Sequence, residues 1–232
     1  MRAQTIMAVG AHIGDMDLTA GPVLAQNVLD GGRSVLVALT PGERGHPRLS
    51  VDEYRDQKIA ETQSFARTIG AEVHVFDDLS DGFLAPDDVI ADRLAMLMRE
   101  ERPDLVLAHW RHSMHSDHEA AAVIAGRARF LSGLPGYREQ DAARHGVGQL
   151  LHTENWEDAE GYIADLCVTI SDEAFARWRE AISAQAFARG ETYGFRYIDY
   201  YVAQMTLRGC LAGTSRAVAL SDTTFPSMAT LA

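Results

Sequence analysis

The sequence predicts an α/β protein in which a mostly parallel sheet is covered by helices on both faces, as a three-layer sandwich. Short apolar segments alternate with longer segments of helical spacing through the first half of the chain, an order typical of parallel sheets. The apolar segments are almost continuously hydrophobic, which indicates strands that are buried on both faces. The 232 residues, of which 47% are hydrophobic and 23% charged, suit one domain spanning 1–232.

Four strands and three helices are expected before the middle of the chain. The expected strands are the apolar runs 5–11, 34–39, 72–76 and 104–108. The expected helices lie between them: one ends at Asp30 before two glycines, and the others cover 52–69 and 87–101. Pro22 is tolerated only in the first turn of a helix, so the first helix is expected to be capped at Thr19.

A further helix is predicted after the fourth strand, and the pattern then becomes less regular. Ser116 and Glu119 are spaced as a capping box, and the residues that follow are good helix formers. Beyond Gly133, segments 149–152 and 166–170 are interpreted as strands. The helices expected there cover 172–189 and 200–211.

Composition argues against several classes of partner. A formal net charge of −12 disfavours nucleic acid and anionic membranes. No stretch approaches the roughly 20 apolar residues of a membrane span, and the apolar run near the N-terminus is too short for a secretory signal. Cys167 and Cys210 are interpreted as reduced thiols, so the chain is expected to be cytoplasmic.

Four of the nine histidines occur at a spacing of three: His109, His112, His115 and His118. No single helix or strand directs all four at one ion. They fall where a strand ends and a helix begins, which is where open α/β proteins place their chemistry. His115 and His118 are therefore the candidates for function, and His109 and His112 are expected to be ordinary polar loop residues.

A second group of candidate metal ligands follows the first strand. His12 and Asp15 are three residues apart, and the carboxyl ends of parallel strands can bring them close to His118. Two histidines and a carboxylate with an open position form a usual catalytic zinc site. The same ligands also suit non-haem iron, although the order of elements argues against an oxygenase. In the alternative without a metal, Asp15 caps a helix and His12 is a loop residue.

These two motifs resemble those of the PIG-L/LmbE-like metal-dependent N-deacetylases, which have a Rossmann-like fold. The family motifs usually read Ala-His-Pro-Asp-Asp-Glu and His-Pro-Asp-His, and they correspond here to residues 11–16 and 115–118. The resemblance implies that His12, Asp15 and His118 bind Zn²⁺ or another divalent transition metal. It also implies that the substrate is a small N-acetylated molecule, commonly a glucosamine conjugate, and that the chain can form a homo-oligomer.

Three departures from the family pattern concern proton transfer. Gly14 stands where the family has its general-base aspartate, Ser113 corresponds roughly to a tyrosine that steadies the oxyanion, and Gln185 falls near a C-terminal histidine. The resemblance makes His115 the candidate acid or oxyanion donor, and Asp117 is expected to orient it. Glu43, on the loop after the second strand, is considered as the replacement base, together with Asp17, which is otherwise expected to be a solvated helix-start residue.

Three functions therefore remain open. The first is a zinc-dependent hydrolase that removes an N-acetyl group. The second is a metal-binding relative that has lost catalysis and acts as a ligand-binding protein, because Gly14 offers no base. The third is the iron oxygenase.

Overall fold

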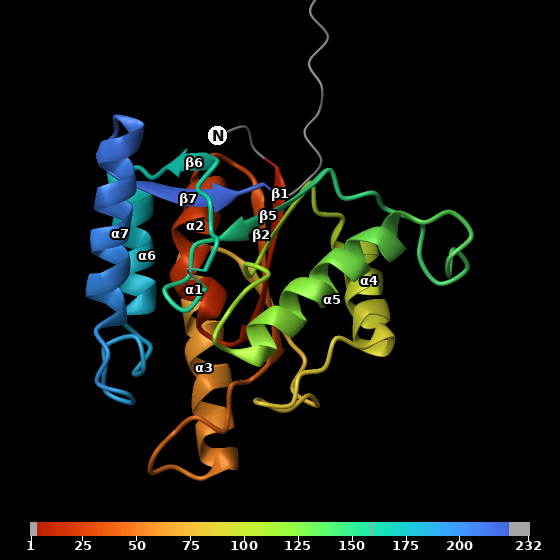
Figure 1. The fold of residues 1–232 in the computed structure, drawn as a ribbon, viewed down its shortest axis with the longest axis horizontal. Helices are drawn as coiled ribbons and strands as arrows, with labels where there is room; N and C mark the ends of the chain where they lie inside the picture. The colour runs from red at the N-terminus through yellow and green to blue at the C-terminus, as the bar shows by residue number, and fades with distance from the viewer. Residues whose placement is uncertain (1–3, 159, 223–232) are drawn as a thin grey trace, which may run out of the picture.

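One mixed sheet organises the computed structural model, which describes residues 4–158 and 160–222. The strand order is β3-β2-β1-β4-β5-β7-β6, and the pairs from β3 to β5 are parallel, whereas β7 is antiparallel to both β5 and β6 (Figure 1). The strands are β1 (Thr5–His12), β2 (Arg33–Thr40), β3 (Glu72–Val75), β4 (Leu105–Ala108), β5 (Gln149–Thr153), β6 (Leu166–Thr169) and β7 (Ala217–Ser221).

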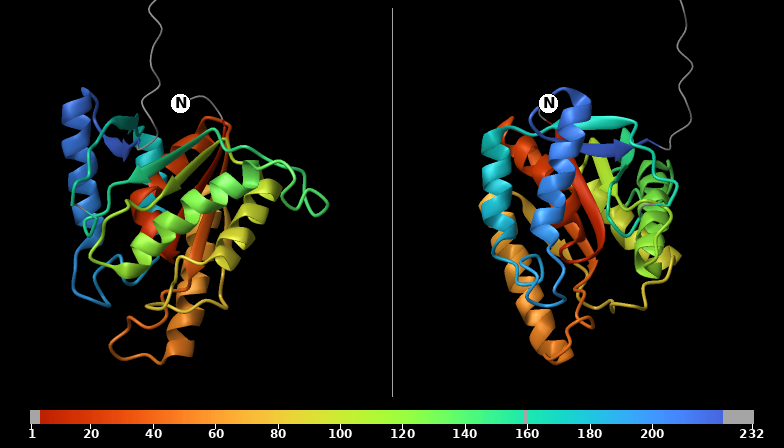
Figure 2. Two further views of the ribbon diagram at one scale, coloured as in Figure 1. Left: turned by 45° about the vertical axis from the view of Figure 1, so that its right-hand side comes forward. Right: turned by 60° about the vertical axis from the view of Figure 1, so that its left-hand side comes forward.

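Helices cover both faces of this sheet, as the alternation of strands and helices predicts. They are α1 (Asp15–Thr19), α2 (Gly21–Leu29), α3 (Val51–Ile69), α4 (Asp88–Glu101), α5 (Ser116–Gly133), α6 (Asp172–Ile182) and α7 (Tyr197–Ala212). Helices α4 and α5 lie on one face, and α2, α3, α6 and α7 lie on the other (Figure 2). The α/β class with a mostly parallel sheet is thus confirmed.

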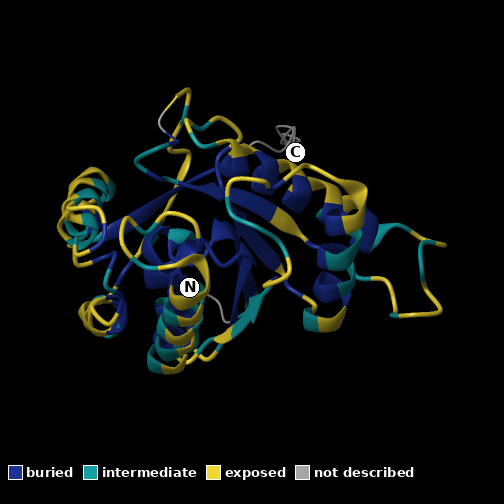
Figure 3. Cartoon of the chain, turned by 90° about the horizontal axis from the view of Figure 1, so that it is seen from below, coloured by how far each residue is buried: buried dark blue, intermediate teal, exposed yellow. Residues whose placement is uncertain are grey.

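Strand β1 shows why the sheet is buried on both sides. Ile6 and Ala8 pack into the core that contains Trp178 of α6, whereas Met7 and Val9 pack into the opposite core beneath α4 and α5. Successive side chains of a strand point to opposite faces, so a strand between two layers needs an unbroken apolar run. Figure 3 shows buried strands at the centre of the sheet and exposed outer faces of the helices, whereas the edge strands β3 and β6 are partly exposed.

The structure differs from the sequence expectation in the number and ends of some elements. The first expected helix is two helices, and Pro22 lies in the first turn of α2, whose N-cap is Ala20 in place of Thr19. The helix expected over 172–189 ends at Ile182. The segment after Ile182 does not continue the helix, because the Ala186 backbone N–H donates to Glu61 and the Gln185 amide donates to the buried Asp17 carboxylate.

Three further observations complete the comparison with the sequence. Strand β7 was not expected, and α7 begins at Tyr197 where 200 was expected. Cys167 and Cys210 are both free thiols on the surface. Among the described residues, every helix is too short or too polar to cross a membrane.

Candidate metal centre

His12, Asp15 and His118 converge at the carboxyl edge of the sheet. His12 ends β1, Asp15 begins α1, and His118 lies in the first turn of α5, which follows the neighbouring strand β4. The Asp15 Oδ2 atom is 3.3 Å from His12 Nδ1 and 3.6 Å from His118 Nε2. Their ligand atoms are close enough together to bind one metal ion.

A carboxylate also lies behind each of these two histidines. His12 Nε2 faces Asp117 Oδ2 at 3.2 Å, and His118 Nδ1 faces Asp158 Oδ1 at 3.2 Å. Metal-ligating histidines commonly bond their outer ring nitrogen in this way, which fixes the ring and raises the basicity of the ligating nitrogen. The outer nitrogens are thus held, and His12 Nδ1 and His118 Nε2 are directed toward Asp15. This donor set fits a divalent transition metal.

The charges of these groups are strongly coupled. Burial would lower the pKa of His12, but Asp15 and Asp117 raise it well above its ordinary value. Burial would raise the pKa of Asp15, but His118 and His12 hold it well below its usual range. For His118, burial is the largest influence and lowers the pKa. Asp15 is therefore held as a carboxylate by the two histidines, and a metal ion bound between these residues would stabilise the same charge.

His109 belongs to this cluster, so the expectation that it is an ordinary loop residue is wrong. It is fully buried, with Nε2 3.0 Å from Asp15 Oδ2 and Nδ1 3.1 Å from Asp158 Oδ2. Burial would lower the pKa of His109, but the hydrogen bonds to Asp15 and Asp158 raise it to about 9. Its place directly after a buried strand next to β1 was the signal in the sequence. His112, in contrast, is exposed as expected.

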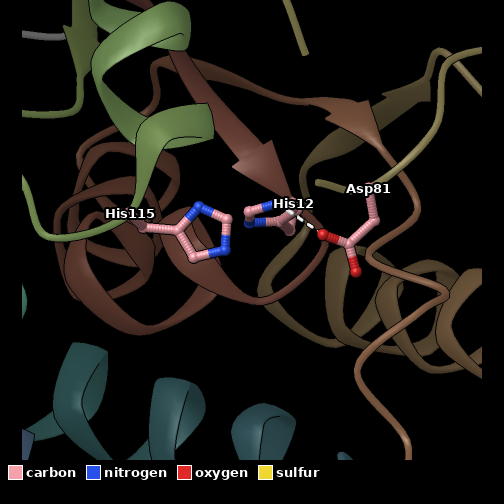
Figure 4. A group of neighbouring side chains, drawn as sticks. All are labelled: His12, Asp81 and His115. Carbon is pink, nitrogen blue, oxygen red and sulfur yellow. Dashed lines mark ion pairs between the residues drawn. The ribbon is translucent and has the colours of Figure 1, made fainter. Parts of the chain in front are cut away.

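His115 is the N-cap residue of α5, a position that the capping-box pattern assigned to Ser116. Its Nδ1 atom accepts the backbone N–H of Asp117 at 3.2 Å. The neutral ring consequently carries its proton on Nε2. The ring packs 4.7 Å from the ring of His12 and 4.8 Å from that of His118, between centroids, and Figure 4 shows it facing His12 opposite Asp81. Burial lowers the pKa of His115, and the neighbouring histidines lower it further.

The sequence suggested that Asp117 orients His115, but the Asp117 side chain contacts His12 instead. This side chain is buried, and Oδ2 accepts the backbone N–H of Gly82 at 2.7 Å in addition to facing His12. The capping bond described above links Asp117 to His115 through the Asp117 backbone N–H alone.

The two carboxylates considered as replacement bases are both buried and already accept hydrogen bonds. Glu43 is buried and accepts hydrogen bonds from Ser80 Oγ at 2.8 Å and from Asp81 N at 3.2 Å, so it holds the loop that carries Asp81. Asp17 is also buried, where a solvated residue was expected. It accepts from Gly14 N, Thr62 Oγ1 and Gln185 Nε2 at 3.2, 3.2 and 2.6 Å, and burial raises its pKa despite these bonds.

Gly14 has a structural reason to be glycine. Its φ angle is 110°, which side-chain-bearing residues rarely adopt, and a Cβ atom there would lie 2.4 Å from Cζ of Phe187. The ring of Phe187 therefore occupies the space next to residue 14, and no carboxylate fits at this position unless the ring moves.

A pocket of about 500 Å³ opens over the candidate ligands. Its lining includes polar residues, which are His12, Asp15, Lys58, Asp81, His115, His118 and Glu157. It also includes an aromatic wall formed by Trp156, Phe187, Tyr193, Phe195 and Tyr197. Sequence reasoning missed Lys58, Asp81, Glu157 and the aromatic wall. The dense aromatic residues over 193–201 and the acidic pair after Trp156 were the available signals.

Two curated relatives catalyse different kinds of reaction. The chain is 28% identical over 143 residues to the 4-oxalmesaconate hydratase of Pseudomonas putida, covering 58% of this chain and 55% of the hydratase. It therefore spans little more than half the length of that relative. It is 25% identical over 213 residues to the 1D-myo-inositol 2-acetamido-2-deoxy-alpha-D-glucopyranoside deacetylase of Streptomyces avermitilis, covering 79% and 69% of the two chains.

Solved structures show the same fold. The 4-carboxy-2-hydroxymuconate hydratase of Pseudomonas putida is similar with a TM-score of 0.87 at 22% identity, covering 99% of this chain and 100% of that one. The N,N'-diacetylchitobiose deacetylase of Pyrococcus horikoshii has a TM-score of 0.77 at 17% identity, covering 94% and 83%. The family model for GlcNAc-PI de-N-acetylases matches residues 7–128, more than half of the chain. The chain therefore belongs to the GlcNAc-PI de-N-acetylase (PIG-L) family.

Proposed function

We propose that this chain is a metal-dependent amide hydrolase that removes the N-acetyl group of a small, ring-bearing substrate such as a glucosamine conjugate. The observation that supports this most is the convergence of His12, Asp15 and His118 on one point of the pocket, with Asp117 and Asp158 behind the two rings. The proposed ion is Zn²⁺, and another divalent transition metal suits the same ligands.

The ion would activate the water molecule, and the surrounding residues would bind the substrate and position the ligands. When bound, zinc lowers the pKa of a water molecule to about 7 and polarises an amide carbonyl. His115 presents its Nε2 proton to the pocket because its Nδ1 accepts a backbone N–H, so it is placed to donate a hydrogen bond to the carbonyl oxygen. Asp117 and Asp158 keep the ligand rings in place. Glu43 acts through Asp81 by holding its loop.

The walls of the pocket favour a neutral, ring-bearing substrate. The aromatic wall offers flat faces on which a sugar or another ring can pack, and Trp156 and Phe195 already stack with centroids 4.8 Å apart. The lining also contains Asp81 and Glu157, which suit an amine product that becomes cationic on release. Both properties agree with hydrolysis of an N-acetylated sugar.

The small number of cationic side chains in the pocket argues against a substrate with several carboxylates. Lys58 is the single lysine or arginine among the pocket residues that the structure describes. Its ammonium already donates to the Ile13 carbonyl and lies 4.2 Å from the centre of the Phe187 ring. Burial also lowers the pKa of Lys58, so this side chain offers less positive charge to substrate carboxylates than a solvated lysine.

Hydration of a carbon–carbon double bond is the second candidate reaction. Two observations favour it: Gly14 offers no carboxylate, and the fold is similar to that of a hydratase with a TM-score of 0.87. A metal site that activates water serves either reaction, because both add water to an electron-poor carbon.

One experiment separates the candidates. Purified protein is loaded with zinc, its metal content is measured, and it is assayed in parallel for amine release from N-acetylated sugars and for loss of ultraviolet absorbance from unsaturated dicarboxylates. Amine release alone supports the hydrolase, and absorbance loss alone supports the hydratase. If the metal-replete protein gives neither signal and still binds N-acetylated sugars in calorimetry, it is the ligand-binding relative. Oxygen uptake with iron is the remaining control.

A further inference from the structure

The ring of Phe187 meets the turn between the candidate ligands His12 and Asp15. A Cβ atom on Gly14, in the middle of that turn, would lie 2.4 Å from Cζ and 2.7 Å from Cε1 of Phe187, so the tip of the ring rests against the Gly14 backbone. The ring lines the pocket and is 6% exposed. An apolar surface thus reaches the part of the pocket where the candidate ligands converge.

Several contacts fix the Phe187 ring in this place. The Lys58 ammonium lies 4.2 Å from the centre of the ring. Asp17 accepts from Gly14 N at 3.2 Å and from Gln185 Nε2 at 2.6 Å. Its carboxylate thereby ties the ligand turn to the segment that carries Phe187. Because packing and hydrogen bonds hold the ring, the fold sets the room in front of it before any substrate binds.

The polar parts of a bound amide have polar partners in the pocket. His115 is placed to donate a hydrogen bond to the carbonyl oxygen, and Asp81 and Glu157 suit the nitrogen, which leaves as an amine. The acyl chain is the apolar part of the amide, and its burial is favourable against an apolar surface. Phe187 and Ile13 are the apolar side chains of the lining at the ligand turn, and Phe187 is the more exposed of the two. The acyl chain is therefore expected to point at the Phe187 ring.

We propose that Phe187 selects the acyl group of the substrate. Its ring closes the pocket behind a methyl group, so that acetyl amides fit and longer acyl chains do not. This inference rests on the proposed amide hydrolysis and adds to it the length of the acyl chain. One extra methylene group in a closed apolar pocket changes selectivity by about 10- to 200-fold. The native protein should prefer acetyl over propionyl amides by a factor in this range.

The first test compares acyl preferences. Zinc-loaded protein is given N-acetyl-, N-propionyl- and N-butyrylglucosamine, and amine release yields kcat/KM for each. We expect Phe187→Ala to lower the preference for acetyl over butyryl by about tenfold or more, because it opens space behind the methyl group. Unchanged preference in Phe187→Ala overturns the proposal.

Phe195→Ala is the matched control. The Phe195 ring also lines the pocket, but it stacks on Trp156 with centroids 4.8 Å apart. Its removal should weaken the binding of all three amides and leave the acyl preference as it is in the native protein. An equal loss of preference in Phe195→Ala and Phe187→Ala overturns the specific assignment to Phe187.

A second variant covers the loss of a largely buried ring, which is expected to lower the stability of Phe187→Ala. Phe187→Leu keeps an apolar side chain but lacks the tip of the ring that meets Gly14. It should fold, bind zinc as the native protein does, and shift the acyl preference in the same direction by a smaller factor. If Phe187→Ala does not fold, a native acyl preference in folded Phe187→Leu overturns the proposal.

The last test needs no turnover. Alkyl hydroxamates bind zinc sites through their two oxygens and carry an acyl chain like that of the amide. Titration calorimetry with acetohydroxamate and butyrohydroxamate therefore probes the same space in zinc-loaded protein. We expect the native protein to bind acetohydroxamate about tenfold more tightly or better, and Phe187→Ala to lose this preference. Equal binding of both by the native protein overturns the assignment of Phe187. The expected binding without amine release from any amide keeps Phe187 as the residue that limits the acyl chain and refutes the proposed hydrolysis alone.

Discussion

Asp117 and His12, which are 105 residues apart in the sequence, meet in a 3.2 Å contact between Oδ2 and Nε2. The contact joins the first turn of α5 to the end of β1. It is possible because β4, which leads to α5, pairs with β1 in parallel, with Val9 opposite Ala108. Asp117, which the sequence analysis expected to orient His115, thus holds the candidate metal ligand His12. Removal of the Asp117 carboxylate is therefore expected to lower metal affinity first.

Replacement of Asp117 by asparagine should weaken metal binding. The substitution removes the negative charge that holds the His12 ring and raises the basicity of its ligating nitrogen. We expect zinc affinity to fall by about 10–100-fold, measured by competition with a chromogenic chelator. Glu119→Gln is the matched control, because it removes a charge from the same helix turn at an exposed position. Equal zinc affinity in both variants would contradict the role of Asp117.

Two histidines of the same run should respond in opposite ways to removal. His118→Ala removes a ligand that is 2% exposed, and zinc should be lost from the purified protein. His112→Ala changes an exposed ring and should leave zinc at one ion per chain. Elemental analysis of both proteins tests this. Stoichiometric zinc in His118→Ala would exclude it as a ligand.

The N-cap position of His115 and its proposed role in catalysis can be separated by the choice of substitution. Asparagine is a good N-cap, so His115→Asn should keep α5 stable while it removes the imidazole. His115→Ala should lose the cap as well, at about 1 kcal/mol of unfolding free energy. We expect both variants to keep zinc and to lose most of the activity, with only the alanine variant less stable in urea denaturation. Native activity in His115→Asn would show that the imidazole is not needed.

The first half of the fold was predictable from the sequence because its signals are local. Apolar runs between helix stops, such as Gly70 after α3, mark elements wherever the rest of the chain lies. The C-terminal part follows tertiary contacts instead. Helix α6 ends at Ile182 although no helix breaker occurs before Gly190, because Gln185 is bound to the buried Asp17.

The residues of the candidate site also fall into two groups, those that local motifs predict and those that depend on tertiary contacts. His12, Asp15 and His118 belong to two short motifs at strand ends, and parallel pairing is sufficient to bring them together. His109, Asp158 and Glu157 belong to no motif. The sequence signal for His109 was its place directly after a buried strand. The role of Asp158 and Glu157 depends on the segment after β5 lying against the end of β4, which follows from the pairing of Ala108 with His152 and not from any local pattern.

The last prediction concerns Gly14 and Phe187. Gly14→Asp places a Cβ atom at a φ of 110°, at about 1–2 kcal/mol, and against the Phe187 ring, at about 1–3 kcal/mol for overpacking. We therefore expect Gly14→Asp to lower the unfolding free energy by about 2–5 kcal/mol, the sum of these two costs. Phe187→Ala removes the obstacle, so the double variant should be more stable than the two single losses predict, by about 0.5–3 kcal/mol.

Urea denaturation of the four proteins measures this coupling. If the losses of unfolding free energy in the two single variants simply add, the Phe187 ring does not clash with a side chain at position 14, and contact with this ring is not why the residue is glycine. Turnover of the double variant adds a second result. If another residue of the native chain acts as the base, an aspartate at position 14 should raise kcat little, whereas a rise of tenfold or more would show that the native chain works without a base.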